Sequence, residues 1–148
     1  MKKHQYFEEF SGLINGIYRN MQKLKSRGAE ELGLKGVHVF WVYLLHKHPQ
    51  GMTAAELADA SQSTNALVSR EIDYLLEEGY VVTDKQSSHR RYGWKFLLTQ
   101  KGTQAAEKIS EIALYVQEKV GEGVSRADLE VFYRTLHILQ RNFDGLTR

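Results

Sequence analysis

The sequence predicts a mainly α-helical domain with a minor β component (α+β). Apolar residues recur at spacings of three to four over most of the chain, which is the period of amphipathic helices. The single proline, Pro49, leaves long stretches in which helices can continue. Two short runs rich in β-branched and aromatic residues, 80–83 and 94–98, enclose a basic loop and predict a hairpin.

Composition limits the classes of protein that fit. The 148 residues, 42% hydrophobic and 26% charged, suit one globular domain with its own core. There is no cysteine, which excludes disulfides and thiolate metal sites. No apolar run reaches the length of a membrane span, and residues 1–10 lack the apolar stretch of a secretory signal. We therefore expect a cytoplasmic protein without a membrane partner.

The N-terminal part of the chain predicts two helices. Residues 4–27 form the first, and Gly28 is placed to end it. Residues 29–36 are expected to connect it to a second helix over 37–47. The β-branched and aromatic residues of that segment would also suit a strand, but its length and its three-to-four spacing favour a helix. A turn at 49–51 follows.

Two helices joined by a polar turn come next. Thr53 and Glu56 have the spacing of a capping box, which starts a short helix that ends near Ala60. Thr64 is the expected N-cap of a longer helix over 65–78. The side chains expected to be buried on this second helix are Val68, Ile72, Leu75 and Leu76.

A basic loop follows this helix pair. Gly79 is expected to end the second helix, and the polar segment 84–93 separates the two β-like runs. Between Asp84 and Lys101 there are five lysines and arginines against one acidic residue. The formal net charge of the whole chain is only +2, so positive charge is concentrated in this region.

Two long helices complete the chain. Thr99 and Ser125 are their expected N-caps, and the first of them should end near Gly121. Both are amphipathic, as is the first helix of the chain, and the three expose more apolar surface than one small module can bury. A second copy of the chain is the economical partner, so we expect a homodimer.

Four segments, taken in order, carry a family likeness. They are TAAELADAS from Thr53, TNALVSREIDYLLEEGYV from Thr64, DKQSSHRR from Asp84 and LTQKG from Leu98. Their order and spacing resemble the MarR family of winged helix-turn-helix transcriptional regulators, over almost the whole chain.

The resemblance implies a single domain over residues 1–148. Within it, residues 37–99 would form the winged helix-turn-helix lobe. Residues 1–28 and 100–148 would form the dimerisation helices.

The helix after Thr64 is then the recognition helix, whose N-terminal side chains reach base edges in the major groove of double-stranded DNA. Arg70 suits guanine and Asn65 suits adenine. The wing would lie along phosphates or in a narrow minor groove, so Arg91→Ala should weaken binding to many sequences alike. The expected DNA-binding residues are Thr64, Asn65, Ala66, Ser69 and Arg70 on the helix, and His89, Arg90, Arg91 and Lys95 on the wing.

The wing departs from the family pattern in two ways. His89 stands where the family carries an aspartate before a basic pair. The tract 91–98 is also one residue longer than the usual pattern, and a β-bulge in the second wing strand would absorb the extra residue. These departures leave open which of Arg90 and Arg91 enters the groove.

The recognition helix carries more acidic than basic residues. Glu71, Asp73, Glu77 and Glu78 outnumber Arg70, so this helix cannot be the main source of affinity for DNA. We expect Asp73 to pair with a basic residue, with the wing as one source.

A small-molecule effector is also implied by the resemblance, in a cleft where the dimerisation helices meet the DNA-binding lobe. The candidate lining residues are Tyr18, His38, Trp41 and Tyr115. Packing in the core is the alternative interpretation, and it is favoured for Trp41.

No pattern in the sequence indicates catalysis. It contains no nucleophile elbow, no glycine-rich phosphate cradle and no histidine spacing typical of a metal site. We therefore expect neither an enzyme nor a cofactor or metal.

These observations predict a sequence-specific DNA-binding regulator that binds a pseudo-palindromic operator as a homodimer. The resemblance implies repression ahead of activation, with release by the effector. The alternative is a winged-helix protein-interaction module that does not read DNA, which the acidic recognition helix and the altered wing favour.

Overall fold

The computed structural model of the chain describes residues 2–84 and 90–148. It divides into two compact units, one up to Ile112 and one from Ala113 to the C-terminus. Six α-helices and a three-stranded antiparallel sheet lie in the described residues, so the mainly α prediction is confirmed. The helices are α1 (Lys3–Glu31), α2 (Gly36–Lys47), α3 (Ala54–Ser61), α4 (Asn65–Glu77), α5 (Gln100–Val120) and α6 (Arg126–Leu146). The strands are β1 (Met52–Thr53), β2 (Val81–Asp84) and β3 (Lys95–Leu98), with a 3-10 turn, η2 (Arg91–Gly93), before β3.

The first helix is longer than expected. The prediction that Gly28 ends α1 is wrong, because the helix continues through it to Glu31. The stop lies at Gly33, which adopts a left-handed conformation with φ of 69°. The backbone N–H of Leu34 then closes the helix end by donating to the carbonyl of Ala29 at 2.8 Å.

The caps of the central helices agree with the sequence. Thr53 Oγ1 accepts from the backbone N–H of Glu56 at 3.2 Å, and Thr64 Oγ1 accepts from that of Leu67 at 3.1 Å. Gly79, with φ of 78°, follows the end of α4. Local chemistry therefore fixes where α3 and α4 begin and where α4 ends.

The sheet has the strand order β1-β3-β2. Strands β2 and β3 pair one residue to one, from Val81 opposite Leu98 to Asp84 opposite Lys95. The predicted bulge in the second wing strand is therefore wrong for the paired residues. The chain instead forms the 3-10 turn at 91–93, which accommodates the extra residue of the tract 91–98 before β3 begins.

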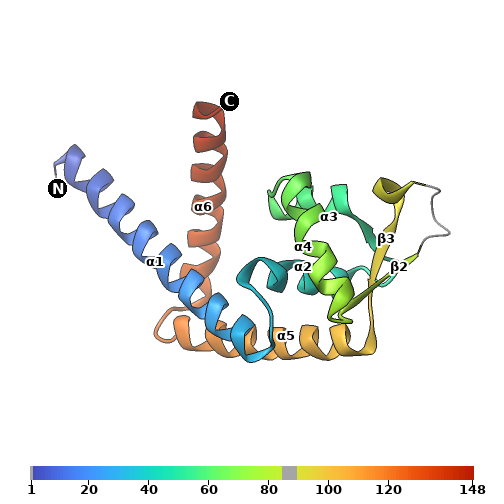
Figure 1. The fold of residues 1–148 in the computed structure, drawn as a ribbon. Helices are drawn as coiled ribbons and strands as arrows, with labels where there is room; N and C mark the ends of the chain where they lie inside the picture. The colour runs from blue at the N-terminus through green and yellow to red at the C-terminus, as the bar shows by residue number, and fades with distance from the viewer. Residues whose placement is uncertain (1, 85–89) are drawn as a thin grey trace. The chain divides into compact units, whose positions relative to one another are not determined.

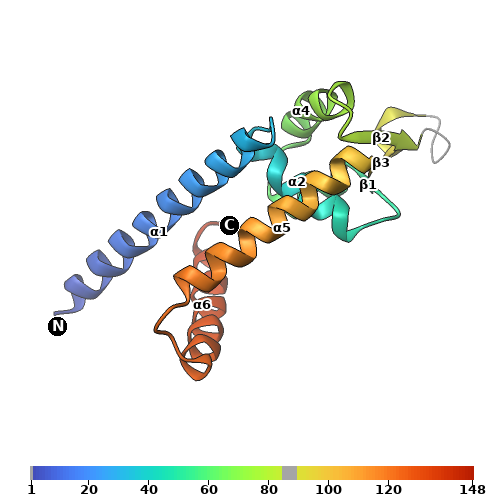
Figure 2. The same cartoon turned by 90° about the horizontal axis from the view of Figure 1, so that it is seen from below.

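The core of the first unit lies between α2, α3, α4, the sheet and the first half of α5 (Figures 1 and 2). Trp41, Leu57 and Val68 are completely buried in it. At the start of α5, Gly102 packs so closely that a Cβ there would lie 2.1 Å from the carbonyl oxygen of Tyr80. The Thr99 cap beside it is confirmed, because Thr99 Oγ1 accepts from the backbone N–H of Gly102 at 3.1 Å.

The two end helices present apolar side chains to solvent. On α1, Tyr6, Phe7 and Met21 are more than half exposed. Within the second unit, Ser125 caps α6 as predicted, and none of the described residues of α6 is buried. Over the described residues, no helix combines the length and apolar character needed to cross a membrane.

Candidate nucleic-acid interface

The first half of α4 carries the predicted recognition residues on its surface. Thr64, Asn65 and Ala66 are exposed at its N-terminus, and Ser69 and Arg70 are exposed one turn further on. The buried side of the same helix holds Val68, Ile72 and Leu75, as expected, whereas Leu76 is only partly buried. The amphipathic pattern of α4 thus leaves a polar face for a partner.

A hollow of about 460 Å³ runs beside this polar face. Its walls come from α3, from α4 and from the base of the wing. The lining residues are Ala54, Ala55, Asn65, Ser69, Ile72, Arg91 and Phe96. Polar and cationic side chains from α4 and from the wing therefore share one concave surface.

The wing residues occupy different positions. Arg90 is exposed just before η2, and Arg91 is the first residue of that turn. The turn is closed by the backbone N–H of Trp94, which donates to the carbonyl of Arg91 at 3.0 Å. Lys95 lies in β3, partly buried, and His89 lies outside the described residues.

Arg91 and Asp73 form an ion pair between the base of the wing and α4. The guanidinium Nη2 of Arg91 donates to Oδ1 of Asp73, and both side chains are about half exposed. The expectation that Asp73 pairs with a basic residue of the wing is confirmed. One of the acids on the recognition helix is thereby neutralised within the protein.

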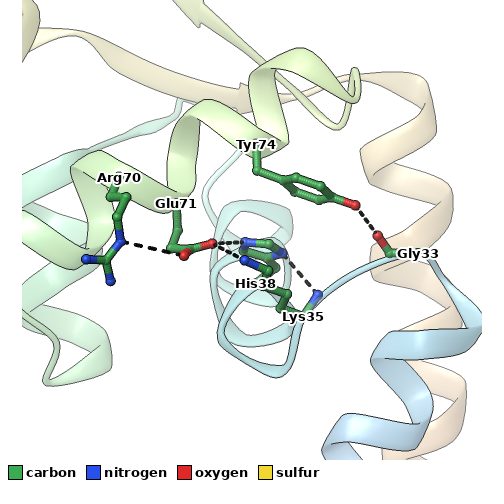
Figure 3. A network of polar contacts seen from close by, with 6 residues as sticks. All are labelled: Gly33, Lys35, His38, Arg70, Glu71 and Tyr74. Carbon is green, nitrogen blue, oxygen red and sulfur yellow. Dashed lines mark hydrogen bonds and ion pairs between the residues drawn. The ribbon is translucent and has the colours of Figure 1, made fainter.

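A second acid, Glu71, is neutralised on the opposite side of α4 (Figure 3). Its Oε2 accepts from His38 Nε2 at 3.0 Å and from Lys35 Nζ at 3.4 Å. Its Oε1 lies 3.8 Å from Nε of Arg70. Glu71 thus links the start of α2 to the arginine that the sequence assigns to base contact.

The hydrogen bonds of His38 define its tautomer. Its Nδ1 accepts from the backbone N–H of Lys35 at 3.1 Å, so the ring proton lies on Nε2 and is donated to Glu71. Burial lowers the pKa of His38 and outweighs the opposing influence of the Glu71 carboxylate. The imidazole is therefore held in its neutral form.

The carboxyl of Glu71 responds to the same contacts. Desolvation, the largest single influence, raises its pKa. The hydrogen bonds from His38 and Lys35 and the positive charge of Lys35 together outweigh that influence, and the net pKa lies below its ordinary value. Glu71 therefore stays charged alongside a neutral histidine.

Aromatic contacts add to this attachment. The ring of Tyr74 stacks on His38 with 4.9 Å between centroids, and its hydroxyl donates to the carbonyl of Gly33 at 2.5 Å. Figure 3 shows that these contacts join α4 to His38 of α2 and to Gly33, which lies between α1 and α2. Sequence patterns did not predict this network, because they marked Glu71 only as an acid on the helix after Thr64 and gave Tyr74 no role.

The proposed effector residues lie in different surroundings. His38 and Trp41 are completely buried, and Trp41 Nε1 donates to Ser61 Oγ at 3.0 Å. Tyr18 is 59% exposed on α1, and Tyr115 is 62% exposed in the second unit. Within the first unit, Tyr18 therefore lies on the surface, apart from the buried His38 and Trp41.

Among the described residues, no three of His, Asp and Glu gather as metal ligands would.

Comparison with known proteins places this geometry in a class. No protein-family model matches the sequence, and no curated protein matches it. Solved structures of transcriptional regulators do match, and they show that the chain has a winged helix-turn-helix fold.

The particular fold is that of the MarR regulators. A MarR transcriptional regulator from Methanosarcina mazei Go1 is 22% identical, with a TM-score of 0.76 over 95% of this chain and 99% of that one. S. aureus MepR, solved as a DNA complex, is 18% identical, with a TM-score of 0.79 over 90% and 96%. A MarR-family regulator from Listeria monocytogenes, solved with a 26mer DNA, is 21% identical, with a TM-score of 0.76 over 87% and 85%. The likeness to this family is therefore confirmed for the fold.

Proposed function

We propose that the chain is a sequence-specific DNA-binding transcriptional regulator. The observation that carries the proposal is the exposed polar face on the first half of α4, set beside a wing that supplies cations. A helix with such an N-terminal face suits the major groove, and a wing suits the backbone or minor groove. The two neighbouring structures that contain DNA support the same role.

Charge neutralisation within the lobe also supports DNA binding. Glu71 is paired with Lys35 and His38, and Asp73 is paired with Arg91. The acids that favoured a protein-interaction module are therefore partly cancelled before any partner arrives. Glu77, which is exposed, lies at the C-terminal end of α4, away from the residues proposed to reach bases.

The assembly that we propose is a homodimer built by the end helices. Exposed aromatic and aliphatic side chains on α1 and on α6 suit burial against the same surfaces of a second copy. A two-fold dimer would present two α4 helices to a pseudo-palindromic operator, with half-sites about one helical turn apart.

Regulation would follow from this arrangement. We propose that the protein represses by occupying DNA that polymerase needs, acts in the cytoplasm and catalyses no reaction. A small-molecule effector that alters the contact between His38 and Glu71 would favour a dimer whose α4 helices no longer match the operator. The link from His38 through Glu71 to Arg70 offers a physical route for that coupling.

Selection of bound duplexes from a randomised pool tests the proposal. We expect enrichment of a two-fold symmetric sequence, and an affinity that falls steeply as salt rises, because phosphate contacts release counterions. The solution mass should correspond to two chains at micromolar concentration. Absence of binding to any duplex at low salt would support the protein-interaction module instead.

A further inference from the structure

We infer that Arg91 is a specificity-determining residue that acts together with the recognition helix, held toward the bases by Asp73. The inference rests on the proposed function and departs from the sequence-based expectation for Arg91. That expectation placed both wing arginines along the backbone or in the minor groove. The structure instead places Arg91 at the first position of η2, close to the start of β3.

The backbone fixes Arg91 at the base of the wing. Arg91 begins η2, which contacts α3, and its carbonyl accepts the N–H of Trp94 at 3.0 Å. The turn leads directly into β3, whose first residue, Lys95, pairs with both Asp84 and Thr53. Arg91 therefore projects from the base of the wing, which is anchored to the helix-turn-helix.

Arg91 faces the polar surface of α4. It lines the same hollow as Asn65 and Ser69. These two residues and Asp73 are spaced by four along α4, so they form one row on the helix. Asp73 ends that row, and its carboxylate holds the Arg91 guanidinium there.

A guanidinium has five N–H donors, and Asp73 engages it through Nη2. Further donors of the fork can serve the O6 and N7 acceptors of a guanine, the commonest specific contact in the major groove. Withdrawal of Arg91 to the minor groove would instead leave Asp73 as an unpaired acid close to DNA. The ion pair therefore favours base contact over backbone contact.

The experiment compares four variants on the duplex selected by the wild-type protein. Binding is measured to that duplex, to its single-base variants and to a random duplex. Arg91→Ala should reduce discrimination at one base pair per half-site by about 5- to 150-fold, the range expected for one bidentate contact. Arg91→Lys is the charge-matched control, which should keep affinity for the random duplex and still lose that discrimination.

Two further variants test whether Asp73 holds Arg91 in place and whether Arg90 contacts the DNA backbone. Asp73→Asn should reduce discrimination at the same base pair, while affinity for the random duplex stays equal or rises, because an acid near the phosphates is gone. Arg90→Ala should weaken binding to all the duplexes alike and lower the salt slope by about one. Thermal unfolding of each variant confirms that these half-exposed positions leave the fold intact.

The possible outcomes distinguish failure of this inference from failure of the proposed function. If the wild-type protein binds no duplex, the proposed function and the inference both fail. If the wild type selects a sequence but Arg91→Ala and Arg91→Lys leave its base preference unchanged, only the inference is overturned. A loss of discrimination in both Arg91 variants, confined to the base pair that Asp73→Asn also affects, supports it.

Discussion

The two sides of α4 neutralise their acids in different ways. On the side toward α2, Glu71 is only 14% exposed and meets a completely buried histidine. On the side toward the wing, Asp73 and Arg91 are each about half exposed. Because the first contact is buried, its loss should destabilise the fold. An unpaired polar group there has no water to replace its partner.

The exposed pair has a different physical role. Water and salt screen it, so it contributes little to folding. We infer that the Glu71 side fixes the position of α4, whereas the Asp73 side holds the Arg91 side chain on the surface of α4.

Glu71→Ala should show the largest effect on stability. It leaves the Nε2–H of His38 buried without its acceptor, so the free energy of unfolding should fall by about 1–3 kcal/mol. Urea denaturation at neutral pH measures the change. Glu77→Ala, an exposed change on the same helix, is the matched control and should stay within about 0.5 kcal/mol of wild type. Equal effects of the two changes would show that the network does not stabilise the fold.

The pH dependence of stability should come next in size. The groups that face His38 are Lys35, Glu71 and Tyr74, and burial holds its pKa below the ordinary value of 6.5. The unfolded chain therefore binds more protons near pH 6, and the contribution of His38 is full above about pH 6.5 and falls as the pH drops. The slope for one such group is at most about 1.4 kcal/mol per pH unit.

Unfolding in urea at several pH values between 7.5 and 5.5 checks this. His38→Gln should flatten the profile relative to wild type, whereas His46→Gln, an exposed change on the same helix, should not. Glu71 adds a further loss at lower pH, because its folded pKa lies below the ordinary value of 4.5. A His38→Gln profile as steep as wild type would place the titration elsewhere.

The comparison also shows which features the sequence can predict. The caps at Thr53, Thr64 and Ser125 depend on residues three apart, so they are visible in the chain itself. The stop of α1 was misplaced because Gly28 and Gly33 both suit a helix end, and packing decides between them. Strand β1 has two residues, too few for any periodicity.

The candidate site was predictable only in part, for a related reason. The exposed face of α4 follows from its period, and charge alone predicted a partner for Asp73 in the wing. The bond between His38 and Glu71 joins residues 33 apart, from two different helices. Whether a glutamate on α4 faces solvent or a buried imidazole depends on tertiary packing, which the local pattern does not encode.

Asp73→Asn should show the smallest effect on stability. The exposed ion pair with Arg91 suggests a change of under about 1 kcal/mol in the free energy of unfolding, although the same substitution should alter DNA discrimination. A double-mutant cycle with Arg91→Ala, read by urea denaturation in low and in high salt, measures the coupling between the two side chains. A coupling that shrinks in high salt fits a screened surface pair. A coupling of several kcal/mol that ignores salt would make the wing contact structural, like the Glu71 network, and would end the distinction between the two sides of α4.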